Sequence, residues 1–127
     1  MASIAPRFRV ETEVDERVAL VSLFGDFGLR VADYCEARLV DVEMRARHVV
    51  VDLRGLTSID RIGVHTLVRA QMRSRQDDWK LTLVHGPPSV DDAFTPPFIE
   101  ELFHWVKHAE AVFPPGHGAG RDAASSP

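Results

Sequence analysis

The chain has 127 residues, of which 45% are hydrophobic and 27% charged, so it fits one globular domain and excludes a multidomain enzyme. Its formal net charge of -4 comes from 15 basic and 19 acidic residues that are interspersed, which argues against a nucleic-acid surface. We find no apolar run that fits a signal peptide or a membrane helix. The single cysteine, Cys35, is expected to be a buried thiol in a cytoplasmic protein.

The first half of the chain predicts a hairpin, a helix and a buried strand. Apolar and polar residues alternate over 7–14 and again over 17–24, which predicts two paired β-strands. Apolar residues recur at helical spacing over 31–44, which predicts an amphipathic helix. The β-branched run 48–53 is typical of a strand buried on both faces, so we expect it at the centre of a sheet.

The second half predicts further elements of both kinds. We expect a loop over 54–60, followed by a second helix that ends at about Arg75. A short strand is predicted over 81–85, where apolar and β-branched residues predominate. Ser89 is a candidate N-cap for a short helical turn over 90–94.

The end of the chain allows two assignments. Residues 98–108 fit a last amphipathic helix, although 103–106 also fit a short edge strand. Gly, Pro, Ala and Ser dominate 113–127, which predicts a disordered tail, and residues 1–7 are expected to be flexible. The predicted domain therefore spans 8–112.

Strands that alternate with helices after an opening hairpin indicate an α/β fold. We expect a mixed, mostly parallel sheet, opened by the hairpin and covered by about four helices. In such sheets the loops after the strands lie at the carboxyl edge, where ligands and partners usually bind. Two loops, 25–29 and 53–63, belong to that edge.

Three sequence blocks occur in order along this predicted fold. A hydrophobic strand ends at Asp52, and a short loop leads to Asp60-Arg61-Ile62-Gly63 at the start of a helix. Residues 25–39 form an upstream loop-and-helix block, and 81–90 form a third block downstream. Together the blocks resemble the STAS domain of bacterial anti-sigma factor antagonists, and the resemblance covers most of the chain.

The resemblance implies a binding module for transcription regulation rather than an enzyme. The expected partner is an anti-sigma factor of the kinase type, which is a histidine-kinase-like ATPase. The alternative is another signalling protein. Docking is expected at the carboxyl edge of the sheet and the first turns of the second helix. The candidate partner-binding residues are Gly25, Asp26, Ser58, Asp60, Arg61, Ile62, Gly63, His65 and Arg69.

The chain departs from the family pattern at its regulatory position. Members that switch by phosphorylation carry Ser or Thr between the Asp and the Gly, where this chain has Arg61 and Ile62. Gly28 also stands where an acidic residue is usual. We therefore expect a constitutive binder or one that is regulated differently. Thr57 and Ser58 carry the nearest hydroxyls and are candidate phosphoacceptors. A role as turn residues that hydrogen-bond their own backbone explains them better.

The second helix carries a predicted cap and a basic stripe. Asp60 is a candidate N-cap that accepts a hydrogen bond from the amide of Gly63. Cations recur every four residues, which fits either a solvated face or a contact with an acidic partner. The stripe consists of Arg61, His65, Arg69 and Arg73.

No pattern in the chain favours catalysis, a metal or a cofactor. Glu101, His104 and His108 have a spacing that puts ligands on one helix face, but an ordinary polar face explains them better. Residues 25–28 lack the glycines and lysine of a phosphate-binding loop, and no nucleophile has a base beside it. The aromatic residues are expected in the core. They are Trp79, Phe94, Phe98, Phe103 and Trp105.

Other functions remain open at this stage. The loops of the carboxyl edge would also suit a sensor of a small molecule or nucleotide. A scaffold role, or an accessory role in a larger complex such as a transport ATPase, is compatible with the resemblance, and so is a homodimer. An enzyme would require His104 and His108, or Asp26 and Asp60, to converge.

Overall fold

The computed structural model describes residues 8–95 and 98–112, which form a five-stranded sheet in the order β1-β2-β3-β4-β5. The first pair of strands is antiparallel and the other three pairs are parallel. The strands are β1 Arg9–Asp15, β2 Val18–Phe27, β3 His48–Ile59, β4 Lys80–Val84 and β5 His104–Val106. The α-helices are α1 Ala32–Glu43, α2 Arg61–Asp77 and the single turn α3 Pro88–Asp91.

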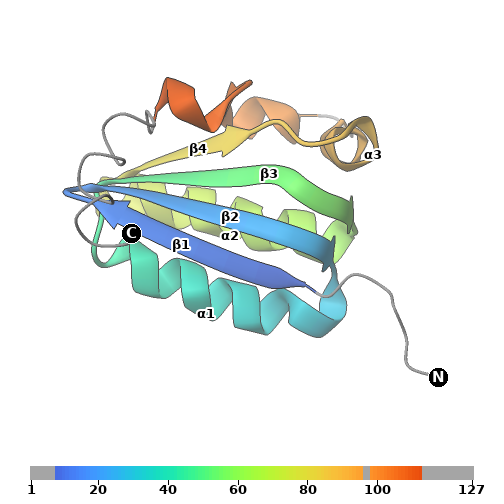
Figure 1. Ribbon diagram of the computed structural model, residues 1–127, viewed down its shortest axis with the longest axis horizontal. Coiled ribbons are helices and arrows are strands. Elements are labelled where there is room, and N and C mark those ends of the chain that lie inside the picture. Colours follow the sequence, from blue (N-terminus) through green and yellow to red (C-terminus); the bar gives the residue numbers. More distant parts are fainter. Residues whose placement is uncertain (1–7, 96–97, 113–127) are drawn as a thin grey trace, which may run out of the picture.

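The predicted α/β fold is confirmed. Helices α1 and α2 lie side by side against one face of the sheet, as Figure 1 shows. Short 3-10 turns complete the described part of the chain, in place of a fourth full helix. They are Leu29–Val31, Asp92–Phe94, Glu100–Leu102 and Ala109–Ala111.

The opening hairpin and the central strand form as expected. In the hairpin, Asp15 pairs with Val18, and Glu16 adopts a positive φ of 57° in the tight turn between the strands. Strand β3 lies between β2 and β4, and its residues 49–53 are all buried, because helices cover one face and the last turn packs on the other. Cys35 of α1 is buried in the main core, as predicted.

The loop expected over 54–60 is wrong, because β3 continues to Ile59. It stays paired with β2, with Phe24 opposite Gly55 and Phe27 opposite Ile59. Two irregularities shift the register along this stretch, so the alternation of apolar and polar residues breaks and resembles a loop in the sequence. Gly55 fits this crowded position because a Cβ there would lie 2.8 Å from the carbonyl oxygen of Leu23.

The helix expected over 98–108 is also wrong, and the edge-strand alternative is confirmed. A 3-10 turn at Glu100–Leu102 is followed by β5, in which Trp105 pairs with Leu83. The side chain of Gln71 donates to the carbonyl of Leu102 at 2.7 Å, and the indole of Trp105 donates to the carbonyl of Glu100 at 2.9 Å. These tertiary bonds favour an extended segment that the periodicity alone does not predict.

Two smaller expectations in this half fail. Ser89 is not an N-cap, because α3 begins at Pro88 and its N-cap is Pro87, so the fixed φ of proline starts the turn. Phe98 lies outside the core and is 74% exposed, whereas Phe94 and Phe103 are buried as expected. The expectations for 1–7 and 113–127 concern residues outside those that the structure describes.

Candidate functional site

The carboxyl ends of β2 and β3 and the first turn of α2 meet at one end of the molecule. The amide of Asp60 donates to the carbonyl of Phe27 at 3.1 Å, which ties the start of α2 to the last residue of β2. Gly63 is buried between them, and a Cβ at this position would lie 2.7 Å from the carbonyl oxygen of Phe27. A larger residue would therefore push α2 away from the strand.

Asp60 caps α2 as predicted. Its Oδ1 accepts a hydrogen bond of 3.0 Å from the amide of Gly63, in the geometry of a helix N-cap. Gly28 approaches the same carboxylate closely, since a Cβ there would lie 2.6 Å from Oδ2 of Asp60. Because Gly28 stands in place of the usual acidic residue, the loop after β2 can lie directly against the Asp60 cap.

Asp26 of β2 accepts hydrogen bonds from two hydroxyls of β3. Its Oδ1 accepts hydrogen bonds from Thr57 Oγ1 at 2.5 Å and from Ser58 Oγ at 2.7 Å. The first of these bonds is the main cause that lowers the pKa of Asp26, and the bond from Ser58 adds to it. The expectation that Thr57 and Ser58 bond their own backbone is wrong, because the register shift in β3 turns both hydroxyls toward Asp26.

Helix α2 presents its first basic side chains to solvent. Arg61 and His65 are exposed, and within residues 8–95 and 98–112 neither takes part in an ion pair. Ile62 is half-buried beside them. Leu29, in the 3-10 turn that follows Gly28, is 72% exposed and adds an apolar group that the sequence motifs alone do not indicate.

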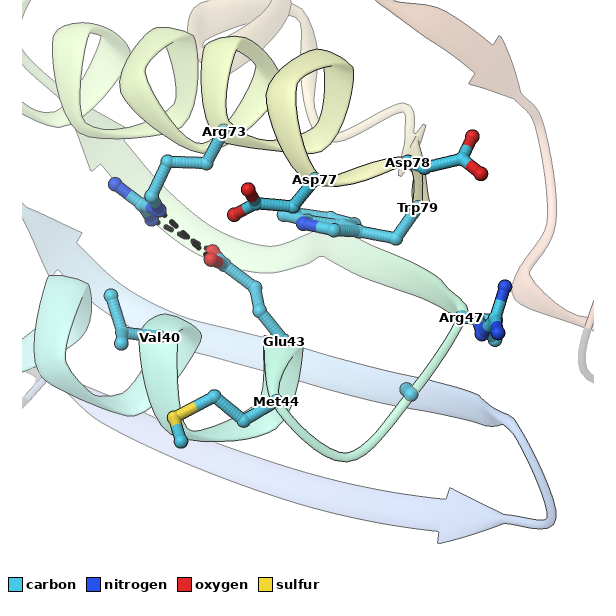
Figure 2. Close-up of a pocket in the computed structure, with 9 residues that line it drawn as sticks. Val40, Glu43, Met44, Arg47, Arg73, Asp77, Asp78 and Trp79 are labelled. Carbon is cyan, nitrogen blue, oxygen red and sulfur yellow. Dashed lines mark hydrogen bonds and ion pairs between the residues drawn. The ribbon is translucent and has the colours of Figure 1, made fainter.

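The rest of the basic stripe is engaged within the molecule. Arg69 binds Glu36 of α1 through Nη2 and Nε, at 2.6 and 3.0 Å from Oε1. Arg73 binds Glu36 at 2.5 Å and Glu43 at 2.7 Å, and the latter pair is visible in Figure 2. We call these four residues the interhelix clasp, which consists of Glu36, Glu43, Arg69 and Arg73. The stripe therefore divides into two residues without an ion pair in the described part of the chain, Arg61 and His65, and two that join the helices, Arg69 and Arg73.

A hollow of about 540 Å³ lies beside the clasp, where α1 and α2 end. Figure 2 shows Trp79 and Met44 at this hollow, with the Arg73–Glu43 pair at one side. It lies at the opposite ends of α1 and α2 from Asp60, so it is separate from the edge where the predicted site residues gather.

The candidate metal ligands do not come together. Glu101 lies in a 3-10 turn, His104 in β5 and His108 just before the last turn, so they share no helix face. Among the described residues no group of three or more His, Cys, Asp or Glu is placed to hold a metal ion. Among the same residues, no helix has the length and apolar character needed to cross a membrane.

Comparison with known families agrees with this fold. Residues 9–109 match the model of the STAS domain, so the chain belongs to the STAS domain family. The three sequence blocks, including Asp60 and Gly63, lie within the matched range. No curated protein sequence matches the chain.

Solved structures share the architecture at low sequence identity. An anti-sigma factor antagonist from Mycobacterium paratuberculosis has a TM-score of 0.75 and 15% identity, covering 84% of this chain and 92% of its own. The Bacillus cell fate determinant SpoIIAA, in its phosphorylated form, has a TM-score of 0.65 and 15% identity over 84% and 97% of the two chains. SLC26A9 has a TM-score of 0.66 and 9% identity over 84% of this chain and 21% of its own. At these identities the similarity shows the fold alone.

Proposed function

We propose that this STAS domain is a protein-binding module of bacterial transcription regulation that binds a kinase-type anti-sigma factor. Its contact surface is the docking edge, where β2, β3 and α2 meet. The docking edge consists of Gly25, Asp26, Leu29, Ser58, Asp60, Arg61, Ile62, Gly63 and His65. Its main support is the exposed Arg61 in the first turn of α2, beside the Asp60 cap.

The position of Arg61 at the start of α2 supports a role in partner contact. A cation in the first turn of a helix is opposed by the helix dipole, which typically costs about 0.3 to 1 kcal/mol. No carboxylate in the described part of the chain forms an ion pair with Arg61, and the neighbouring Asp60 offsets that cost only in part. We infer that Arg61 is kept for contact with an acidic partner surface, with which a guanidinium forms strong paired hydrogen bonds.

The same position bears on regulation. Phosphorylation of a hydroxyl would place nearly two negative charges in the contact surface. Arg61 and Ile62 carry no hydroxyl, so we propose that the module binds its partner without that switch. Arg69 was a candidate contact residue, but its guanidinium already binds Glu36, so the proposed surface does not depend on it. We place the protein in the cytoplasm and assign it no catalytic step.

The first test is affinity capture from a native lysate, with identification of the captured proteins by mass spectrometry. The bait variants are Arg61→Glu and, as a matched control, Arg75→Glu in the last turn of the same helix. We expect the wild type and Arg75→Glu to capture a histidine-kinase-like ATPase and Arg61→Glu to lose it. Because Arg61→Glu suits the helix dipole, its melting temperature should not fall, so lost capture is not lost folding.

Three results would each contradict part of the proposal. Equal capture of that ATPase by both variants would move the contact away from Arg61. Capture of no ATPase of this kind would remove the anti-sigma factor assignment while leaving the family membership intact. A constitutive binder should also capture the same amount of the ATPase before and after phosphatase treatment of protein and lysate, so a gain in capture after that treatment would exclude the unswitched mode.

A further inference from the structure

A second hollow, of about 640 Å³, lies where the chain leaves β4. This volume is in the range of small-molecule sites, and polar side chains from several elements converge on it. We call it the β4 pocket, and its lining residues are Arg54, His85, Gly86, Pro87, Asp91 and Lys107. It shares no residue with the docking edge, so a ligand there would not require the proposed protein partner.

Arg54 is held in place by a neighbour on the same strand. Asp52, whose side chain is only 11% exposed, accepts hydrogen bonds from Nε and Nη2 of Arg54 at 3.0 and 2.8 Å. The Asp52 carboxylate also accepts the amide of Arg54 at 3.0 Å. The remaining nitrogen, Nη1, lies 3.8 Å from Glu110, which is too far for a hydrogen bond. The guanidinium is therefore fixed with one nitrogen free to donate.

His85 is held equally firmly. Its Nδ1 lies 3.1 Å from Oδ2 of Asp91, while Oδ1 of Asp91 accepts the amide of Gly86 at 2.9 Å. The imidazole ring stacks on Trp105 with the ring centres 4.6 Å apart and an angle of 11° between the planes. Within the described residues Nε2 has no hydrogen-bond partner, so it is the ring nitrogen that remains for a ligand.

Lys107 supplies a cation without a partner. It is exposed, lines the β4 pocket, and makes no ion pair in the part of the chain that the structure describes. Asp91 is the lining carboxylate, and both its oxygens are already occupied by His85 and Gly86. The groups left for a ligand are therefore two cationic donors, Nη1 of Arg54 and the ammonium of Lys107, together with Nε2 of His85. Because Nδ1 donates to Asp91, Nε2 accepts from a P–OH group when the ring is neutral and donates to an oxygen when the ring is protonated. This set favours an oxyanion that can also carry a proton.

We propose that the β4 pocket binds a phosphoryl group, carried either by inorganic phosphate or by a small phosphate monoester. The three groups come from β3, from the exit of β4 and from the segment after β5, so the sheet itself positions them. Glu110 opposes the anion, but only through the 3.8 Å contact with Nη1, which a phosphate oxygen would replace. The volume of the hollow leaves room for an organic group beyond the phosphate.

Trp105 provides a direct readout. The chain has two tryptophans, and Trp79 lies at the opposite end of β4, so the Trp79→Phe variant isolates the fluorescence of Trp105 stacked on His85. We would titrate this variant with inorganic phosphate, AMP and adenosine at constant ionic strength, because salt screens such contacts. Saturable fluorescence changes with phosphate and AMP, but not with adenosine, are expected. Tighter binding of AMP than of phosphate would identify a monoester as the better ligand.

The chain also offers a matched pair of lysines for the decisive comparison. In the same background, Lys107→Gln should weaken phosphate binding about tenfold, the effect of one charge-assisted hydrogen bond. Lys80→Gln, at the other end of β4, should leave the affinity unchanged. Both side chains are exposed, so neither change should impair folding, which circular dichroism would check. Equal binding by the two variants, or no saturable binding of phosphate or AMP, would overturn the proposal.

Discussion

At the scale of single residues, hydrogen bonds within the docking edge stabilise the negative charge of Asp26. The carboxylate is exposed, yet two hydroxyl donors from β3 bind one of its oxygens. Both bonds favour the ionised form and lower its pKa, the one from Thr57 more than the one from Ser58. This ionised side chain is paired with hydroxyls rather than with a cation, so Arg61 remains available for a partner.

Removing the donors should therefore move the Asp26 titration. In a Thr57→Val, Ser58→Ala double variant we expect the pKa of Asp26 to rise toward its ordinary value, with Thr57→Val alone having the larger single effect. Carboxyl-carbon NMR shifts measured against pH would report this directly, and Asp41, which pairs with Arg45, is an internal control. An unchanged Asp26 titration would show that the hydroxyl bonds are not maintained in solution.

The sign of the matching stability effect follows from linkage. A pKa that is lower in the folded than in the unfolded chain stabilises the fold above the ordinary Asp pKa. That contribution is lost as the pH falls through the folded pKa of Asp26. The difference in unfolding free energy between the wild type and the double variant should therefore shrink on acidification. Thermal unfolding at a series of acidic pH values would measure this change.

At the scale of elements, the interhelix clasp couples α1 to α2. Glu36 has a lowered pKa, chiefly because Arg69 donates to it; burial opposes this effect, and Arg73 adds to the lowering. Glu43 is more deeply placed, with only 7% of its side chain exposed beside Arg73. A buried charge without its partner is costly, so Arg73 should matter more to stability than the half-exposed Arg69.

We predict that Arg73→Met lowers the free energy of unfolding by about 2 to 4 kcal/mol, because it leaves Glu43 buried and unpaired. Arg69→Met, whose side chain is 51% exposed, should cost less than about 1 kcal/mol. The double variant Glu43→Met, Arg73→Met should recover part of the loss, since no buried charge then remains. Urea unfolding would compare the three, and equal losses for both single variants would contradict this ranking.

Some helices and strands of this fold were predictable from the sequence and others were not. Helix α2 was predictable because its apolar spacing and the Asp60 cap agree, and the buried run in β3 was predictable from its β-branched residues. The extension of β3 to Ile59 was not, because its register shifts remove the alternation on which strand prediction depends. Strand β5 has only three residues and depends on pairing with β4, so its local periodicity cannot decide its conformation.

The candidate site shows the same division between local and tertiary information. The bond from the Gly63 amide to Asp60 is local, and residue type and spacing predicted it. The bonds from Thr57 and Ser58 to Asp26 join residues more than thirty positions apart, and the sequence carries no signal for them. The engagement of Arg69 by Glu36 is equally remote, so an equal spacing of cations could not distinguish exposed residues from paired ones.

At the scale of the whole molecule, the carboxyl edge and the helix ends are joined by one continuous core. Residues from every strand of the sheet and from α1 and α2 pack into it, either buried or partly buried. The docking edge and the interhelix clasp therefore rest on the same packed unit. Local opening of one without the other would require breaking the contacts of this core.

Cys35 offers a probe of that unit, because it is the chain's one cysteine and is fully buried in α1. Burial raises the pKa of the thiol to about 12, and the adjacent Glu36 adds to the effect. The thiolate is the reactive species, so the native protein should react very slowly with a thiol reagent such as DTNB near neutral pH.

We predict that the labelling rate of Cys35 follows the stability of the whole domain. When reclosing is faster than labelling, each loss of about 1.4 kcal/mol in unfolding free energy should raise the rate about tenfold. Arg73→Met should therefore label faster than the wild type by the factor that its urea unfolding implies, and Arg61→Glu should not. Rapid labelling of the folded wild type would mean that α1 opens on its own. In that case the clasp would link two separately stable units rather than secure a single one.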